Sequence, residues 1–283
     1  MNVRQVGKKI KSFGNVKKIT NAMQLVSAVK MKKAQLAAQD GRPYQELLEE
    51  AIHNLTKKGG AVESVYLTKP NDKNTKKLMI VVTSNKGLCG AFNFNLIRSI
   101  QKDIQKDSTF ITIGKKGTVL ISHLGGSVLA DFSSSSLLDS VSAVFQLALD
   151  GYLKGTYSEV VLVYNKFIST LKSEPVVKTI LPVSIKGTHD DKNVMEADYT
   201  VEPSPQVVLD ALLKSFIEEQ IRFAIVESEA GEHSARMVAM KNATDNAANV
   251  IYNLTLLKNK LRQQSITYEL LDMITAKESV ESN

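Results

Sequence analysis

The sequence predicts an α/β fold: a long antiparallel coiled coil of the N- and C-terminal helices plus a central α/β domain. Two observations carry this prediction. Apolar residues recur every three or four positions near both ends of the 283-residue chain, which is typical of helices that bury a seam. Between them, short β-branched runs alternate with helical segments, which favours a mainly parallel sheet. The expected divisions are an N-terminal helix over 1–58, a central domain over 75–200 and a C-terminal helix over 204–280.

The N-terminal helix is predicted from a run of apolar residues at helical spacing. These residues are Val3, Val6, Ile10, Phe13, Val16, Ile19, Met23 and Val26. The step from Phe13 to Val16 is one residue short of a strict heptad, so the supercoil is expected to overwind there. Gly41 and Pro43 are expected to interrupt the helix, and a second stretch from Tyr44 to Lys58 ends where two glycines follow.

The middle of the chain predicts a compact domain in which strands and helices alternate, as in a Rossmann-like fold. Strands are expected at 78–83, 109–113, 159–164 and 176–182. Helices are expected at 92–105, 115–124 and 136–152. Crossover helices between neighbouring strands make the predicted sheet mainly parallel.

The C-terminal helix is expected to begin with Ser204 as its N-cap and Pro205 at its first position. Its predicted seam consists of Met240, Ala243, Ala247, Val250, Leu254, Leu257, Leu261, Gln264, Tyr268 and Leu271. The domain between the two helices returns the chain, so the helices are expected to pair antiparallel. Replacing Leu254 or Leu257 with Asp should cost several kcal/mol, since each buried leucine contributes about 2 kcal/mol and a buried charge adds a penalty.

The charge distribution indicates an acidic partner. The formal net charge is +7, yet residues 1–39 contain nine basic side chains and no acidic one. Such a helix suits nucleic acid, an anionic membrane surface or an acidic protein loop. No run of 18 apolar residues is present to span a bilayer. The single cysteine, Cys89, excludes an internal disulfide and favours a reducing compartment.

The strongest chemical motif is the glycine turn Thr83–Gly90, which follows a predicted strand and precedes a predicted helix. That context suits phosphate binding, but the spacing matches neither dinucleotide nor P-loop motifs, and a structural turn is the favoured interpretation. Cys89 has no histidine nearby in sequence to act as its base, and the four histidines lack zinc-ligand spacing. We therefore predict no catalytic residue, no metal and no cofactor. A dinucleotide-binding enzyme using Lys86–Gly90 remains a weak alternative.

Several motifs resemble the gamma subunits of rotary ATP synthases. In the N-terminal helix these are Ile10-Lys11-Ser12, Lys18–Met23, Lys30–Gln35 and Arg42-Pro43-Tyr44, and the turn Thr83–Gly90 is similar to that family's first strand-to-helix turn. The most specific matches are Ser234–Ala247 and Arg262–Leu270, in the same order in the C-terminal helix. The leading alternative to this resemblance is a basic coiled-coil nucleic-acid-binding protein.

The resemblance implies a non-catalytic rotor shaft that couples proton flow through a membrane ring to ATP synthesis in an alpha/beta catalytic head. The implied partners are the alpha and beta subunits, the epsilon subunit and the ring of membrane c subunits, at the cytoplasmic face of the cell inner membrane as a peripheral protein. Carried over by motif, the contacts with the head are Lys18, Met23, Arg236, Arg262, Gln263, Thr267 and Glu269. The implied contacts with the membrane ring are Tyr199 and Glu202.

Overall fold

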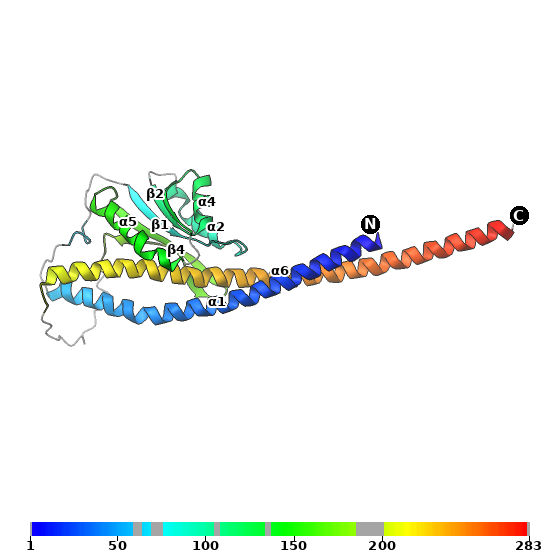
Figure 1. The fold of residues 1–283 in the computed structure, drawn as a ribbon, viewed down its shortest axis with the longest axis horizontal. Helices are drawn as coiled ribbons and strands as arrows, with labels where there is room; N and C mark the ends of the chain where they lie inside the picture. Colours follow the sequence, from blue (N-terminus) through cyan, green and yellow to red (C-terminus); the bar gives the residue numbers. More distant parts are fainter. Residues whose placement is uncertain are drawn as a thin grey trace. The chain divides into compact units, whose positions relative to one another are not determined.

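A computed structural model describes residues 2–58, 64–68, 76–104, 108–133, 137–184 and 201–281 (Figure 1). The chain divides into two compact units, which are described separately. Unit 1 comprises residues 1–27 and 236–283, and unit 2 comprises residues 28–235. Two long helices contribute to both units: α1 (Val3–Lys58) and α6 (Pro205–Glu281). No helix in the described part of the chain has the length and hydropathy of a membrane span.

Unit 2 is built on a five-stranded sheet with the order β3-β2-β1-β4-β5. The strands are β1 (Lys77–Val82), β2 (Ser108–Ile113), β3 (Ser127–Phe132), β4 (Glu159–Ser169) and β5 (Lys172–Leu181). The first four in this order are parallel neighbours, and β5 pairs antiparallel with β4 as a hairpin. The central strand β1 is almost entirely buried because helices cover both faces of a parallel sheet.

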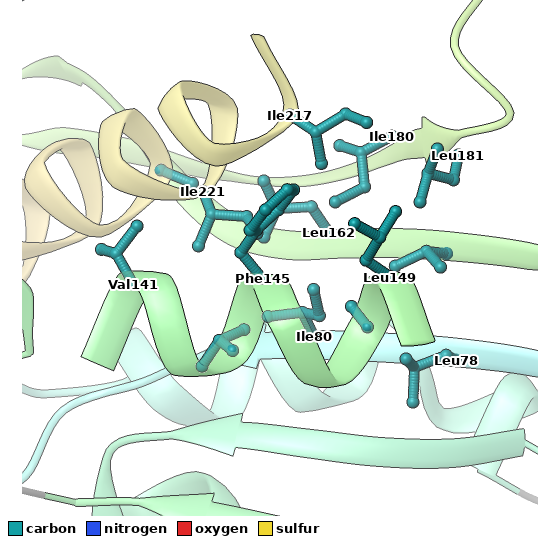
Figure 2. Packing of buried hydrophobic residues seen from close by; sticks show 14 of the residues in the cluster. Leu78, Ile80, Val141, Phe145, Leu149, Leu162, Ile180, Leu181, Ile217 and Ile221 are labelled. Atoms are coloured by element: carbon teal, nitrogen blue, oxygen red, sulfur yellow. The ribbon is translucent and has the colours of Figure 1, made fainter. Parts of the chain in front are cut away.

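Helices cover the sheet of unit 2 on both faces, which gives three layers. One face carries α2 (Phe92–Ser99), α3 (Gln101–Ile104) and α4 (Lys115–His123). The other face carries α5 (Val141–Leu153), which follows the short 3₁₀ helix η1 (Leu138–Ser140), together with α6 and the end of α1. Figure 2 shows the main core, in which Phe145 of α5 and Ile221 of α6 pack over Leu162 of β4.

The predicted fold class is confirmed, with differences in detail. Strand β3 was not predicted, and its residues are only half-buried or exposed in alternation. The hairpin strands are also longer than expected, since β4 continues past Tyr164 to Ser169 and β5 begins at Lys172 instead of Val176. This extension carries Pro175, which an edge strand tolerates because its missing N–H faces away from the ladder.

The predicted interruption of the first helix is wrong, because α1 runs without a break from Val3 to Lys58 with Pro43 inside it. A proline removes one backbone donor, and burial of Leu48 and Ile52 in the core of unit 2 offsets that loss. The predicted start of α6 is confirmed: the Val207 N–H donates to Ser204 Oγ at 3.4 Å.

The seam of α1 also differs from the prediction. Five of its seven buried positions recur at multiples of seven, namely Val6, Thr20, Ser27, Ala34 and Leu48, and the other two, Ala38 and Ile52, each lie four residues after one of these. The helix therefore keeps a strict heptad, and no short step occurs after Phe13. The residues assigned to the seam by apolarity, Val16, Ile19 and Val26, are 43%, 59% and 57% exposed. The other predicted seam residues are buried or half-buried, namely Val3, Val6, Ile10, Phe13 and Met23. Apolar spacing alone failed at three positions because two polar residues occupy the seam and apolar residues lie outside it.

Candidate partner-binding surface on the terminal helices

Unit 1 is an antiparallel pair made from the start of α1 and the second half of α6. Its register is marked by a hydrogen bond between the hydroxyls of Thr20 and Thr244, 2.7 Å apart. The Thr244 hydroxyl also donates to the Met240 carbonyl at 2.8 Å, which anchors it to its own helix. On α6 the buried seam residues are Met240 and Ala247. The small side chain of Ala247 lets the two helix backbones approach closely.

The end of α6 extends beyond the pairing partner that α1 supplies. Because the helices run in opposite directions, pairing Thr20 with Thr244 places Val3, the first residue of α1, opposite residue 261. Burial follows this register: Leu261 is half-buried, and every side chain from Arg262 to Lys277 is exposed. The helix nevertheless continues to Glu281.

This exposed end of α6, which we call the α6 tail (residues 262–277), carries large apolar side chains. They are Ile266, Tyr268, Leu270, Leu271, Met273 and Ile274, all close to half exposed or more. They do not form one narrow stripe, so pairing with a single helix would leave some of them in water. A contiguous group of exposed apolar side chains of this kind marks an interaction site.

Unit 1 is also strongly basic. The first 27 residues contain six Lys and Arg side chains and no acidic one, and residues 236–268 contain five against the single acidic Asp245. All six N-terminal cations are exposed. A surface with charges of one sign attracts an oppositely charged partner. This attraction weakens as the salt concentration rises. The surface therefore favours an acidic partner around its paired part and an apolar partner around the α6 tail.

Most of the predicted head-contact residues lie on this surface. Lys18, Arg262, Gln263, Thr267 and Glu269 are exposed, and Met23 is half-buried. Two tail side chains bond locally, since the Thr267 hydroxyl donates to the Gln263 carbonyl at 3.0 Å and the Ser265 hydroxyl donates to Glu269 Oε1 at 3.3 Å. Arg236 differs from the others, being only 7% exposed. A contact between Arg236 and another subunit stays a prediction.

The two residues predicted to meet a membrane ring lie away from unit 1 in sequence. Tyr199 lies outside the described residues. Glu202 is exposed in the segment that leads into α6, two residues before the Ser204 cap. Its role also stays a prediction.

The glycine turn Thr83–Gly90 is held by hydrogen bonds to α2 and to the start of α4. Asn93 of α2 accepts from the Ser84 N–H at 3.0 Å and donates from Nδ2 to Ser84 Oγ at 2.7 Å. The Thr83 hydroxyl accepts from the Gly117 N–H at 2.8 Å and donates to the Gly114 carbonyl at 2.9 Å. Cys89 is buried beside the Asn93 amide, 3.4 Å from Nδ2. These bonds match the structural-turn interpretation, in which the loop's polar groups connect strand ends to helices.

Sequence reasoning missed four apolar residues of the tail: Ile266, Leu270, Met273 and Ile274. It placed Leu257, Tyr268 and Leu271 in a coiled-coil seam, yet these are 37%, 67% and 51% exposed. The heptad pattern continues past the point where the partner helix begins, so periodicity alone overestimates the length of the pair. The signal that could have found the tail is the difference in length between the two helical segments.

Comparison with known proteins supports one family. Residues 2–280 match the family model described as ATP synthase. The ATP synthase gamma chain of Variovorax paradoxus is 38% identical over 281 residues, covering 96% of each chain. That of Cupriavidus metallidurans is 36% identical over 289 residues, covering 98% of this chain and 99% of that one.

The fold is also similar to solved structures. A chain in the cryo-EM structure of the Euglena gracilis mitochondrial ATP synthase aligns with a TM-score of 0.70 at 16% identity, covering 99% of this chain and 95% of that chain. A chain of the Tetrahymena thermophila mitochondrial ATP synthase central stalk and c-ring aligns with a TM-score of 0.57 at 22% identity, covering 80% of this chain and 99% of that chain.

Proposed function

This chain belongs to the family of ATP synthase gamma chains, and we propose that the basic surface of unit 1 and the α6 tail are its contacts with the catalytic head. A gamma chain is a non-catalytic subunit that forms the central rotor shaft. Rotation of the shaft couples proton flow through the membrane ring to ATP synthesis at sites in the beta subunits. Such coupling requires contacts that differ between the conformations of the head.

The observation that carries the proposal is the α6 tail, where sixteen consecutive residues from Arg262 to Lys277 are exposed while carrying six large apolar side chains. Burying these side chains against another subunit is worth roughly 25 cal/mol per Å² of apolar surface removed from water. An apolar sleeve around the tail would bury side chains that point in all directions. Because it would form no directional hydrogen bonds with the tail, it would not resist rotation of the shaft.

The basic part of unit 1 supports the second half of the proposal. Its six exposed N-terminal cations are spread along α1 from Arg4 to Lys18, which suits attraction to acidic loops of the beta subunits without deep interlocking. In this proposal Lys18, Met23, Arg262, Gln263, Thr267 and Glu269 contact the head. Arg236 remains with this group as a buried member. The same proposal includes Tyr199 and Glu202 as contacts with the c ring, and it includes the epsilon subunit as a partner and the cytoplasmic face of the inner membrane as the location.

The nucleic-acid-binding alternative is not supported. The full-length relatives are ATP synthase gamma chains.

The head contact is tested by replacing Arg262 and Gln263 together with Ala in the assembled enzyme. Because both side chains are exposed in the isolated chain, the fold should be unaffected, while protons pumped per ATP hydrolysed should fall. The measurement is ATP-driven acidification of membrane vesicles beside the hydrolysis rate. A matched control replaces Arg98 and Gln101, which are exposed on unit 2. Equal coupling in both double variants would remove this pair from the proposed contact.

A further inference from the structure

One face of α6 in unit 2 packs against the β4–β5 hairpin. Its residues, which we call the hairpin-facing stripe, are Gln220, Ala224, Glu227, Gly231 and Ser234. They recur at spacings of four and three, which places them on one side of a helix, and all five are buried. The stripe is made of small and polar residues, and of these only Ala224 belongs to the core that the leucine and isoleucine positions of α6 enter.

The hairpin follows this stripe from end to end. Near its start, Lys178 of β5 donates from Nζ to Gln220 Oε1 at 2.7 Å. At its far end, the Ser234 hydroxyl donates to the carbonyl of Thr170, in the hairpin turn, at 2.5 Å. The two bonds are fourteen residues apart on α6, about four helical turns. Between them lies the buried Glu227 carboxylate, which Lys166 and Lys178 of the hairpin and Arg42 of α1 attract.

Gly231 is the point of closest approach. A Cβ at this position would lie 3.2 Å from Cε2 of Phe92 and 3.5 Å from Cβ of Ser173. Phe92 is itself fixed to the hairpin, because its carbonyl accepts from Nδ2 of Asn165 at 3.2 Å. Glycine is unfavourable inside a helix, so its presence here has a packing reason. The α6 backbone therefore lies directly against the sheet domain at this point.

We propose that Gly231 is a positioning residue that, with the two terminal hydrogen bonds of the stripe, prevents α6 from turning about its own axis relative to the sheet. Apolar contacts are non-directional and allow α6 to rotate slightly against the sheet. Hydrogen bonds are directional, and a close-packed backbone contact leaves no space for such a rotation. The inference rests on the proposed function, since a rotor shaft must pass torque between the sheet domain and α6. Gly231 thus determines the torsional stiffness of the connection between α6 and the sheet domain.

The first test measures torsional stiffness in the assembled enzyme. The head is fixed to a surface, a bead is attached to the sheet domain, and the angular spread of the bead is recorded without nucleotide. Gly231→Val is expected to lose stiffness and broaden this spread, because the added side chain forces α6 away from Phe92 and Ser173. The matched control is Gly41→Val in α1, where a Cβ would meet only the flexible Glu219 side chain, at 3.9 Å. The control should match the wild type.

The second test restores the connection covalently. The 3.5 Å separation between an added Cβ at Gly231 and Cβ of Ser173 is within the range of about 3.5–4.5 Å found in disulfides. The double variant Ser173→Cys/Gly231→Cys should show a broad spread when reduced and a spread at least as narrow as the wild type when oxidised. Each single cysteine variant should not respond to oxidant.

The outcomes separate the two claims. If wild-type enzyme rotates, but Gly231→Val assembles with unchanged angular spread or the oxidised double variant is no stiffer than the reduced one, the inference about Gly231 is wrong. If the wild-type chain does not assemble with a catalytic head at all, the proposed function itself fails.

Discussion

Two regions of the same helix α6 differ in how far their side chains are buried. In residues 217–235 only Arg222 is exposed, because α1, α5 and the β4–β5 hairpin cover the helix. In residues 262–277 every side chain is exposed, although the sequence is also rich in leucine, isoleucine and methionine. The first region obtains its partners from its own chain, whereas no described part of the chain covers the second. Apolar content therefore indicates a need for burial and does not identify the partner.

The largest expected effect separates these regions by stability. Ile221→Asp places a charge in the core shown in Figure 2, where the side chain is fully buried. It should lower the free energy of unfolding by more than about 4 kcal/mol, from lost apolar burial plus an unpaired buried charge. Urea denaturation of the isolated chain measures this. Leu271→Asp, in the tail, should change the same quantity by less than about 0.5 kcal/mol while reducing assembly with the head. Comparable destabilisation by both would mean that the tail is buried within the chain.

A smaller effect locates the boundary between paired and unpaired helix. Leu254 is half-buried in unit 1, while Leu257 is 37% exposed. Leu254→Asp should destabilise by about 2 kcal/mol, whereas Leu257→Asp should cost less than about 1 kcal/mol because water still reaches the new carboxylate. From the sequence alone, both substitutions were expected to lower the free energy of unfolding equally, by several kcal/mol. Thermal unfolding of both variants makes the comparison, and a Leu257 variant as unstable as the Leu254 variant would extend the pair beyond the observed register.

The smallest effect is a pH dependence in the covered region. Desolvation raises the pKa of Glu227 above its usual 4.5, despite attraction from Lys166, Arg42 and Lys178. Burial, together with the negative charge of Glu227, raises the pKa of the nearby Tyr164 to about 12. The folded state therefore holds the Glu227 proton more tightly than the unfolded state does, so stability falls as pH rises from about 4.5 through the raised folded pKa.

Glu227→Gln removes this titration. Its free energy of unfolding should therefore decline less than that of the wild type across the same pH window. Denaturant titrations at several pH values provide the measurement, with Glu50→Gln, an exposed position on α1, as the control. A steeper decline in Glu227→Gln would show that the neighbouring cations outweigh desolvation.

How much could be predicted depended on whether the signal was local. The buried strands β1 and β2 were predicted almost to the residue, because four to six consecutive apolar or β-branched residues leave few alternatives. Strand β3 was missed because an edge strand is half-exposed and lacks such a run. The outer part of the β4–β5 hairpin was missed because it is polar, and it packs along the hairpin-facing stripe of α6 through contacts distant in sequence.

The candidate site shows the same division. Lys18 and Arg262 were selected by motif, and both are exposed on unit 1, whereas Arg236, selected in the same way, is buried. The apolar side chains of the α6 tail were not selected as contacts, although Ile266, Tyr268 and Leu270 lie within the matched motif Arg262–Leu270. Their importance appears only when the register of the helix pair shows where α1 begins.

The sequence by itself determined two long helices, a parallel sheet between them, the charge of the N-terminal helix and the family likeness, because periodicity, composition and short motifs are local properties of the chain. The tertiary structure alone decided which face of α1 forms the seam, where pairing stops on α6 and why Gly231 is a glycine. These depend on register and on close approach between segments far apart in sequence. A Thr or Ser can occupy a buried seam position when the opposite helix supplies a hydroxyl or a small side chain, and no local pattern records that partner.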